Sequence, residues 1–311
     1  MAQVNMQQVK ELRDRTQAGL NDCRAALMEA EGDMDKAVEV ILKKGLAKSA
    51  KRAGAVASEG IVSALVSDDG RQGVIVEVNI QTDFAARNED FLAFVGNVVQ
   101  VAAKAPSGAD LGAQPYPGGS ATVEETRQAL VGRLGENITV RRWARLSVQG
   151  AGRVHAYVHM GGKIGVLLAV STGADNVLTD ERFVGFLDDV AMQAAAMAPQ
   201  YLSTADVPED AKRKQSEIYE AQLAEEGKPE QARPNIIKGK LAKWMKEICL
   251  LEQQSVIHTD KTIEQLRAEL EKTLGTSVKV DGFVRYERGE GIDKPPAEDF
   301  AAEVAKSMGS S

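Results

Sequence analysis

The chain has 311 residues, of which 43% are hydrophobic and 27% are charged, so it is long enough for two domains and can bury a sizeable core. Its formal net charge of −7 argues against a general nucleic-acid binder, because such a protein needs a basic face. Two lone cysteines without CxxC spacing, a polar N-terminus and the lack of an apolar run of about 20 residues predict a cytoplasmic protein without a disulfide framework or a membrane span.

The first 45 residues predict three short helices that pack into a small bundle. Asn5, Asn21 and Asp33 are placed to cap these helices, and Gly45 stands where a glycine commonly follows the last helical residue. Apolar residues recur at helical spacing in each of the three segments. They are Val9 and Leu12, then Cys23, Ala26, Leu27 and Ala30, and finally Met34, Ala37, Val38, Ile41 and Leu42.

Residues 46–59 are small and basic, which predicts a linker. Apolar residues then alternate with others over 61–65 and 74–80, a pattern that predicts two strands joined as a hairpin. A helix is expected to start near Asn88, and after a Pro/Gly-rich loop Thr122 opens another helix with a capping box. A third strand, ITVRRWARLSV, completes this unit.

The same pattern then recurs loosely. Val154–His159 and Ile164–Val170 predict a second hairpin, Glu181–Met197 a helix, and Val278–Tyr286 a late strand. A helical hairpin over about 208–254 interrupts this second unit, and its second arm carries a coiled-coil-like seam. The seam residues are Ile237, Leu241, Trp244, Ile248 and Leu251. Two antiparallel hairpin-plus-helix units with a helical insertion predict an α+β fold.

Thr82-Asp83-Phe84 is the most informative segment, because it follows a buried strand and precedes the next helix. A large aromatic residue at a strand end more often tucks into its own core than faces solvent. The wider segment VEVNIQTDFAARNEDF, however, resembles the EVN-x-QTDF-V-A-[RK] signature of the elongation factor Ts family, with Ala85 where valine is common.

The resemblance extends over nearly the whole chain and rests on five segments in the family's order. The other four are VKELRDRTQAGLNDCRAALMEAEGD at the start, LGENITVRR, AYVHMGGKIGVL and DGFVRYERGEGI near the end. The first is similar to the family's ubiquitin-associated-like domain, which binds the nucleotide domain of elongation factor Tu. Five separated matches in one order make a chance resemblance very improbable.

The resemblance gives the predicted units their identities. We expect an N-terminal three-helix ubiquitin-associated-like bundle, two related core subdomains, a helical-hairpin insertion and a C-terminal helical module. Their boundaries are 1–45 for the bundle, 46–59 for the basic linker, 60–150 for the first core subdomain, 151–203 with 257–287 for the second, 204–256 for the insertion and 288–311 for the C-terminal module.

The resemblance also implies a function in which the chain itself makes and breaks no covalent bond. The chain is expected to bind elongation factor Tu·GDP, disturb its Mg²⁺ site and promote release of GDP during translation elongation. Thr82, Asp83, Phe84 and Ala85 correspond to the segment that displaces the magnesium ion, with Phe84 as an apolar wedge. We expect no cofactor or metal in the chain itself and no direct nucleic-acid partner.

Further partner-binding residues follow from matching positions. They are Arg24, Lys51, Leu134, Gly135, Asn137, His159, Phe300 and Val304. Each also has a less specific interpretation. Lone basic residues are more often solvated, a histidine beside turn glycines is more often an exposed hairpin residue, and an apolar C-terminal stripe more often docks within its own chain.

Three alternatives remain open from the residues. The chain could be an adaptor whose basic linker touches RNA, although a solvated linker is the better interpretation of the lysines there. It could be an enzyme that uses Asp83 and His159 as an acid–base pair, without a supporting nucleophile or metal set. The helical hairpin is either a homodimerisation element, as in some relatives, or a pair of arms that pack on each other.

Overall fold

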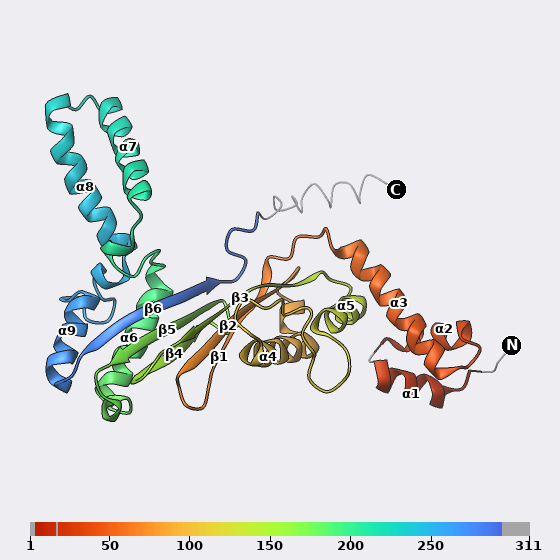
Figure 1. The fold of residues 1–311 in the computed structure, drawn as a ribbon. Coiled ribbons are helices and arrows are strands. Elements are labelled where there is room, and N and C mark those ends of the chain that lie inside the picture. Colours follow the sequence, from red (N-terminus) through yellow and green to blue (C-terminus); the bar gives the residue numbers. More distant parts are fainter. Residues whose placement is uncertain (1–3, 17, 294–311) are drawn as a thin grey trace.

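The computed structural model describes residues 4–16 and 18–293 (Figure 1). The helices are α1 (Met6–Thr16), α2 (Leu20–Glu29), α3 (Met34–Arg52), α4 (Glu89–Lys104), α5 (Val123–Leu134), α6 (Glu181–Met197), α7 (Glu209–Glu225), α8 (Arg233–Ile248) and α9 (Ile263–Leu274). The strands are β1 (Glu59–Val66), β2 (Gln72–Ile80), β3 (Ile138–Ser147), β4 (Gly152–His159), β5 (Ile164–Thr172) and β6 (Val278–Glu287). This mixture of helices with antiparallel sheets confirms the α+β class.

Helices α1 to α3 form an N-terminal bundle whose core contains all the predicted stripe residues except Leu42, which is exposed. The Asn5 side chain accepts a hydrogen bond from the Gln8 amide, and the Asp33 side chain accepts from the Asp35 and Lys36 amides, so both expected caps are confirmed. The expected cap at Asn21 is wrong. With Asn21 as the cap the helix would start at Asp22, but α2 starts two residues earlier, at Leu20, and Gly19 at the cap position offers no side-chain hydrogen bond.

The prediction that Gly45 ends the third helix is also wrong, because α3 continues to Arg52. Lys51 therefore lies on a helix, and the connection to β1 is shorter than the predicted basic linker. Gly45 serves a different purpose, since α3 crosses α5 there. A Cβ built on Gly132 would lie 2.9 Å from the Cα of Gly45. Two glycines at one point let the helix backbones come this close.

The first core unit is the three-stranded antiparallel sheet β1-β2-β3 with α4 and α5 on its outer face. Asn88 caps α4, accepting from the Asp90 amide, and Thr122 with Glu125 forms the expected capping box of α5. Phe91 and Phe94 of α4 are fully or almost fully buried against β2.

The second unit repeats the first with the sheet β4-β5-β6 and the helices α6 and α9. Helix α9 was absent from the predicted elements, although Thr262 and Gln265 form a capping box like that of α5. Both helices have 12 residues and end at a left-handed glycine, Gly135 in α5 and Gly275 in α9. A strand begins three residues after each of these glycines.

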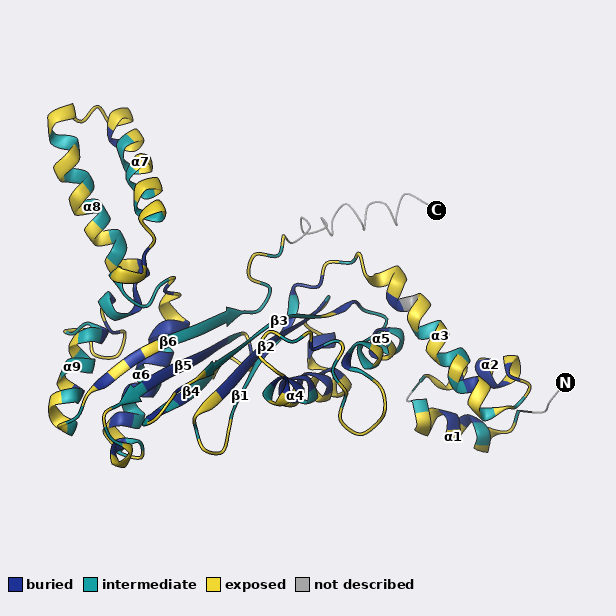
Figure 2. Ribbon diagram, in the orientation of Figure 1, coloured by how far each residue is buried: buried dark blue, intermediate teal, exposed yellow. Residues whose placement is uncertain are grey.

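The two sheets pack face to face, so the core has helices outside and two sheets inside. Val62 and Ile75 from the first sheet pack against Val154, Leu167 and Ala169 from the second. Figure 2 shows that the buried residues concentrate in these strands and in the inner sides of the covering helices, whereas α7 and α8 are largely exposed.

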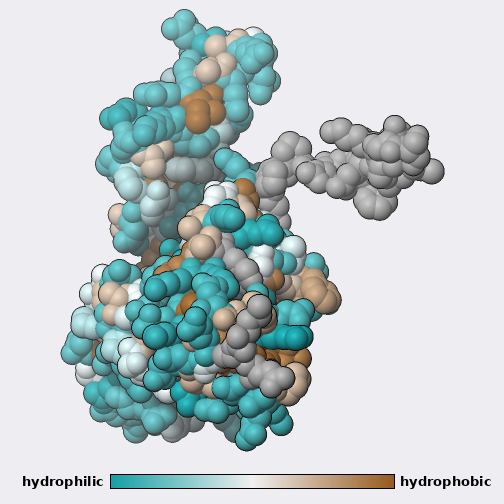
Figure 3. Space-filling view, turned by 90° about the vertical axis from the view of Figure 1, so that its right-hand side faces the viewer, coloured by the Kyte–Doolittle hydropathy of each residue, from teal (hydrophilic) through white to brown (hydrophobic). Residues whose placement is uncertain are grey.

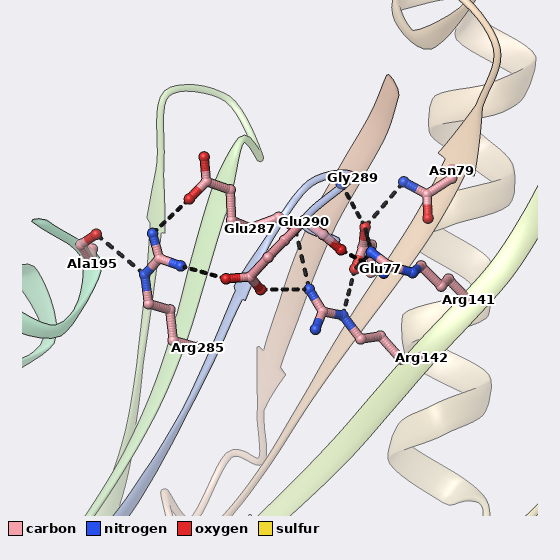
Figure 4. A network of polar contacts seen from close by, with 9 residues as sticks. All are labelled: Glu77, Asn79, Arg141, Arg142, Ala195, Arg285, Glu287, Gly289 and Glu290. Carbon is pink, nitrogen blue, oxygen red and sulfur yellow. Dashed lines mark hydrogen bonds and ion pairs between the residues drawn. The ribbon is translucent and has the colours of Figure 1, made fainter. Parts of the chain in front are cut away.

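A polar cluster closes one end of the layer between the sheets (Figure 4). The fully buried carboxylate of Glu77 accepts hydrogen bonds from Arg141 at 3.0 Å, Arg142 at 2.5 Å, Asn79 at 3.0 Å and the Gly289 amide at 2.8 Å. Burial raises the pKa of the Glu77 carboxyl, but the hydrogen bonds outweigh it and hold the pKa below its ordinary value. The carboxylate therefore stays ionised.

Helices α7 and α8 project from the second unit as the expected helical hairpin (Figure 1). Helix α8 ends at Ile248, earlier than predicted, and Leu251 lies in the 3₁₀ turn that follows. Trp244 packs beside Ile248 and Val207 at the base of the hairpin, which accounts for this part of the seam by contacts within the chain.

The described part of the chain has no helix long and apolar enough to cross a membrane. In Figure 3 the face turned to the viewer is mostly hydrophilic, and its hydrophobic patches are small and separated.

Candidate functional site: an aromatic loop at the end of β2

The Thr82–Phe84 loop joins the end of β2 to a 3₁₀ turn over Ala85–Arg87. The Phe84 side chain is 86% exposed, whereas Ala85 and Ala86 are buried in the core of the first unit. The interpretation in which Phe84 tucks into its own core is therefore wrong. The two alanines anchor the loop inward while the aromatic ring points to solvent.

Hydrogen bonds to Glu136 and Asn137, in the segment that follows α5, hold the Thr82–Phe84 loop in place. The carboxylate of Glu136 accepts from the Thr82 amide at 3.0 Å and from the Thr82 hydroxyl at 2.7 Å. The same hydroxyl oxygen accepts from the Ala85 amide at 3.2 Å. In addition, the Asn137 amide donates to the Gln81 side chain at 2.7 Å. Two segments more than 50 residues apart in sequence thus become one surface element.

Leu134, Gly135 and Asn137, expected at the partner interface, are brought next to this loop. Gly135 adopts the left-handed conformation with φ 75°, which ends α5 and turns the chain toward Thr82. Asn137 is only 6% exposed, and its side-chain amide donates to the Ala55 carbonyl at 2.8 Å. Its contacts are thus internal to the chain, and they join the segment before β1 to the loop.

Asp83 and Arg87 form an ion pair at 3.2 Å in which both side chains are largely exposed. His159 lies at the end of β4, exposed, with its Nδ1 2.8 Å from the Tyr157 hydroxyl. Among the described contacts, no hydrogen bond joins Asp83 to His159. The geometry therefore does not support the alternative in which these two residues form an acid–base pair.

The β4–β5 turn nevertheless lies at the same end of the sheets as the aromatic loop. The Val62 amide donates to the Gly162 carbonyl at 2.8 Å, which holds the turn against β1. Strand β1 in turn pairs Glu59 with Ile80, the last residue of β2. His159 and the aromatic loop thus flank the start of one strand.

The remaining predicted residues are more dispersed. Arg24 on α2 and Lys51 on α3 are both exposed. Phe300 and Val304 lie outside the described residues. Sequence reasoning overlooked Glu136 as a site residue, although it stands inside the recognised LGENITVRR segment. Its role depends on a contact with Thr82, and no local pattern reveals that contact.

An aromatic ring held in solvent on a hydrogen-bonded loop is suited to docking, because the ring can gain burial against a second macromolecule. The fold and this loop are those of an α+β protein that presents an exposed aromatic side chain on an anchored loop.

Comparison with known proteins gives the family. The family model described as Elongation factor TS matches residues 81–290. The chain is 44% identical over 308 residues to Elongation factor Ts of Clostridium botulinum (strain Alaska E43 / Type E3), covering 98% of this chain and 99% of the relative. It is 46% identical over 309 residues to Elongation factor Ts of a Nitratiruptor species, with the same coverage. The chain belongs to the elongation factor Ts family, and this membership makes it a translation elongation factor.

Proposed function

We propose that the chain is a cytoplasmic guanine-nucleotide exchange factor that binds elongation factor Tu·GDP and promotes release of GDP during translation elongation. Family membership supports the exchange reaction and its partner. The observation that carries the proposal in this molecule is Phe84, an aromatic residue 86% exposed on a loop whose flanking residues are anchored.

The proposed mechanism is a coupling between two binding equilibria. Nanomolar nucleotide binding corresponds to about 12 kcal/mol, and the partner's magnesium ion supplies a large local charge in such a site. Insertion of Phe84 between helices of the partner would bury its ring and contribute about 1.5–3 kcal/mol. This contribution helps to deform the magnesium site but covers only part of the effect, so other contacts must supply the rest. Bound nucleotide and bound exchange factor then weaken each other reciprocally.

Asp83 is proposed to orient the wedge and to perturb the groups around the partner's Mg²⁺ without ligating the ion. In the free protein its carboxylate pairs with Arg87 at the surface. An exposed ion pair of this kind contributes little to stability, so Asp83 can exchange Arg87 for a partner group at small cost. Ala85, buried below the loop, is proposed to support the wedge by packing and not by contact with the partner.

The wider docking surface would extend from the aromatic loop in both directions. Leu134 and Gly135 flank the loop on one side, and His159 lies on the β4–β5 turn. Arg24 and Lys51 would add contacts from the N-terminal bundle. The proposed docking of the C-terminal segment rests on the sequence resemblance alone.

Release of mant-GDP from elongation factor Tu tests the proposal. Catalytic amounts of the chain should accelerate the fluorescence decrease after excess GDP is added. The double variant Asp83→Ala/Phe84→Ala should lose most of this acceleration while its circular dichroism spectrum stays unchanged. Absence of any acceleration by the wild-type chain would refute the exchange function.

A further inference from the structure

Thr82 and Glu136 form a clamp under the aromatic loop. The Thr82 hydroxyl accepts from the Ala85 amide and donates to Glu136 Oε1, while the Thr82 amide donates to Glu136 Oε2. Both oxygens of one carboxylate are thus used on one residue. Hydrogen bonds to an ionised acceptor are stronger than neutral ones. Because Phe84 lies between Thr82 and Ala85, the clamp fixes the backbone on both sides of the exposed ring.

The internal repeat provides a built-in comparison. In each unit, the first paired residue after the β-bulge of the central strand lies ten positions before the residue that caps the next helix. These two residues are Val78 and Asn88 in the first unit, and Val170 and Asp180 in the second. By this spacing, Thr82, Phe84 and Ala85 of the first unit correspond to Ala174, Asn176 and Val177 of the second. Counting from the glycine after each short helix makes Thr276 the counterpart of Glu136.

The second unit builds the same loop without the clamp. Ala174 has no hydroxyl and Thr276 has no carboxylate, and the Gly173 amide instead donates to the Ser277 carbonyl at 3.0 Å. Val177 is buried, as Ala85 is, but exposed Asn176 takes the place of the aromatic residue. This connection between strand and helix therefore forms without a carboxylate. Of the two repeats, the one that presents an aromatic ring is the one that has the clamp.

We infer that Glu136 is a positioning residue for nucleotide exchange, acting through Thr82 to hold the Asp83–Phe84 segment in the conformation that enters the partner. The inference rests on the proposed exchange function. A loop fixed before docking avoids the entropy cost of ordering it at the interface. Glu136 does not itself need to touch the partner's nucleotide site.

The test uses stopped-flow mant-GDP release over a range of exchange-factor concentrations. Glu136→Ala and Thr82→Val should each lower the maximal release rate about tenfold, equivalent to about 1.4 kcal/mol of transition-state stabilisation. The half-saturating concentration should change by less than about threefold, because most of the interface is intact. Thr82→Ser keeps the hydroxyl and should restore most of the rate. The double variant should lose less than the sum of the two single losses, because both substitutions remove the hydrogen bond between the Thr82 hydroxyl and Glu136.

If Glu136 has this positioning role, its removal should loosen the loop and leave the stability of the whole fold unchanged, which a purely structural role would not give. The melting temperature should stay the same in Glu136→Ala, whereas hydrogen exchange of the Thr82 amide should become faster by about tenfold or more. Glu181→Ala, at an exposed first-turn position of α6, is the control and should match the wild-type chain in every measurement. Full exchange activity of Glu136→Ala, additive effects in the double variant, or a loss of rate that follows a loss of stability would each overturn the inference.

Failure of the underlying function is distinguishable from failure of the clamp. If the wild-type chain does not accelerate release, the exchange function is wrong, and the Thr82 amide still reports whether the clamp orders the loop. If the wild-type chain is active and the Thr82 amide is equally protected in Glu136→Ala, the positioning role is wrong.

Discussion

Two phenylalanines seven residues apart in sequence have opposite environments. Phe84 is 86% exposed, whereas Phe91 on α4 has no exposed surface. Leaving a phenylalanine side chain in water forgoes about 1.5–3 kcal/mol of burial free energy. Phe84 therefore contributes little burial free energy to the fold, and we expect a smaller residue at this position to leave the stability nearly unchanged.

The same substitution at these two positions should separate folding from function. Phe91→Ala should lower the free energy of unfolding by about 3–5 kcal/mol, because it leaves a cavity between α4 and β2. Phe84→Ala should change this free energy by less than about 0.5 kcal/mol, as expected for a surface substitution. Urea denaturation followed by circular dichroism measures both. A large loss of stability in Phe84→Ala would show that the ring has a packing role in the free chain.

At the scale of elements, the N-terminal bundle is positioned by the crossing of α3 and α5. The backbones meet at Gly45 and Gly132, where a side chain on Gly132 would overlap the opposite backbone. Only a shift of a whole helix can relieve such a contact, because no flexible side chain is available to move. This crossing sets where Arg24 and Lys51 lie relative to the aromatic loop.

Gly132→Ala is predicted to destabilise the α3–α5 crossing by about 1–3 kcal/mol through overpacking, despite the better helix propensity of alanine. Thermal unfolding measures the change. Gly239→Ala on α8 is the matched control, because a Cβ there meets no atom within 4 Å. That variant should be unchanged or more stable by up to about 1 kcal/mol. Equal behaviour of the two variants would show that the close approach is easily relieved.

Most elements were predictable because their signals are local. The caps at Asp33, Asn88 and Thr122 and the alternation in β2 identify those elements without reference to other parts of the chain. Helix α9 carried an equally local signal in its Thr262 capping box. The expected helix end at Gly45 failed for another reason, since a glycine required by packing cannot be told from a terminating one without knowledge of α5.

For the whole molecule, the Glu77 cluster joins the two units at one end of the layer between the sheets. Glu77 on β2 accepts from the Gly289 amide after β6, and Arg142 on β3 bridges Glu77 and Glu290 at 2.5 and 3.1 Å. Arg285 from β6 reaches Glu290 and Glu287 (Figure 4). At this end of the interface, one buried, ionised carboxylate thus accepts hydrogen bonds from both units.

This cluster predicts a dependence of stability on pH. The pKa of Glu77 is lower in the folded chain than its ordinary value. Its contribution is therefore fully present above the unfolded-state pKa of about 4.3 and is lost as the pH falls through the folded-state pKa. Glu77→Gln should lower the free energy of unfolding at pH 7 by about 3 kcal/mol, as when one partner of a buried ion pair is removed. The difference from the wild-type chain should shrink below pH of about 4.

Urea denaturation at about pH 7 and about pH 3.5, on either side of the unfolded-state pKa, measures this difference. Glu290→Gln is the control, because Glu290 belongs to the same cluster but is 48% exposed, and it should cost no more than about 1 kcal/mol. A gap between wild type and Glu77→Gln that does not depend on pH would contradict the assignment of an ionised carboxylate in the folded chain.

Caps, periodicity and family motifs are read over short stretches of chain, so they were enough to predict the α+β class, most helix and strand positions and the candidate segment Thr82-Asp83-Phe84. The folded arrangement was needed to show that Phe84 faces solvent, that Asn137 is buried and that Glu136 holds Thr82. Each of these depends on segments distant in sequence that meet in space. Burial and hydrogen-bond partners are properties of that meeting, so no local pattern contains them.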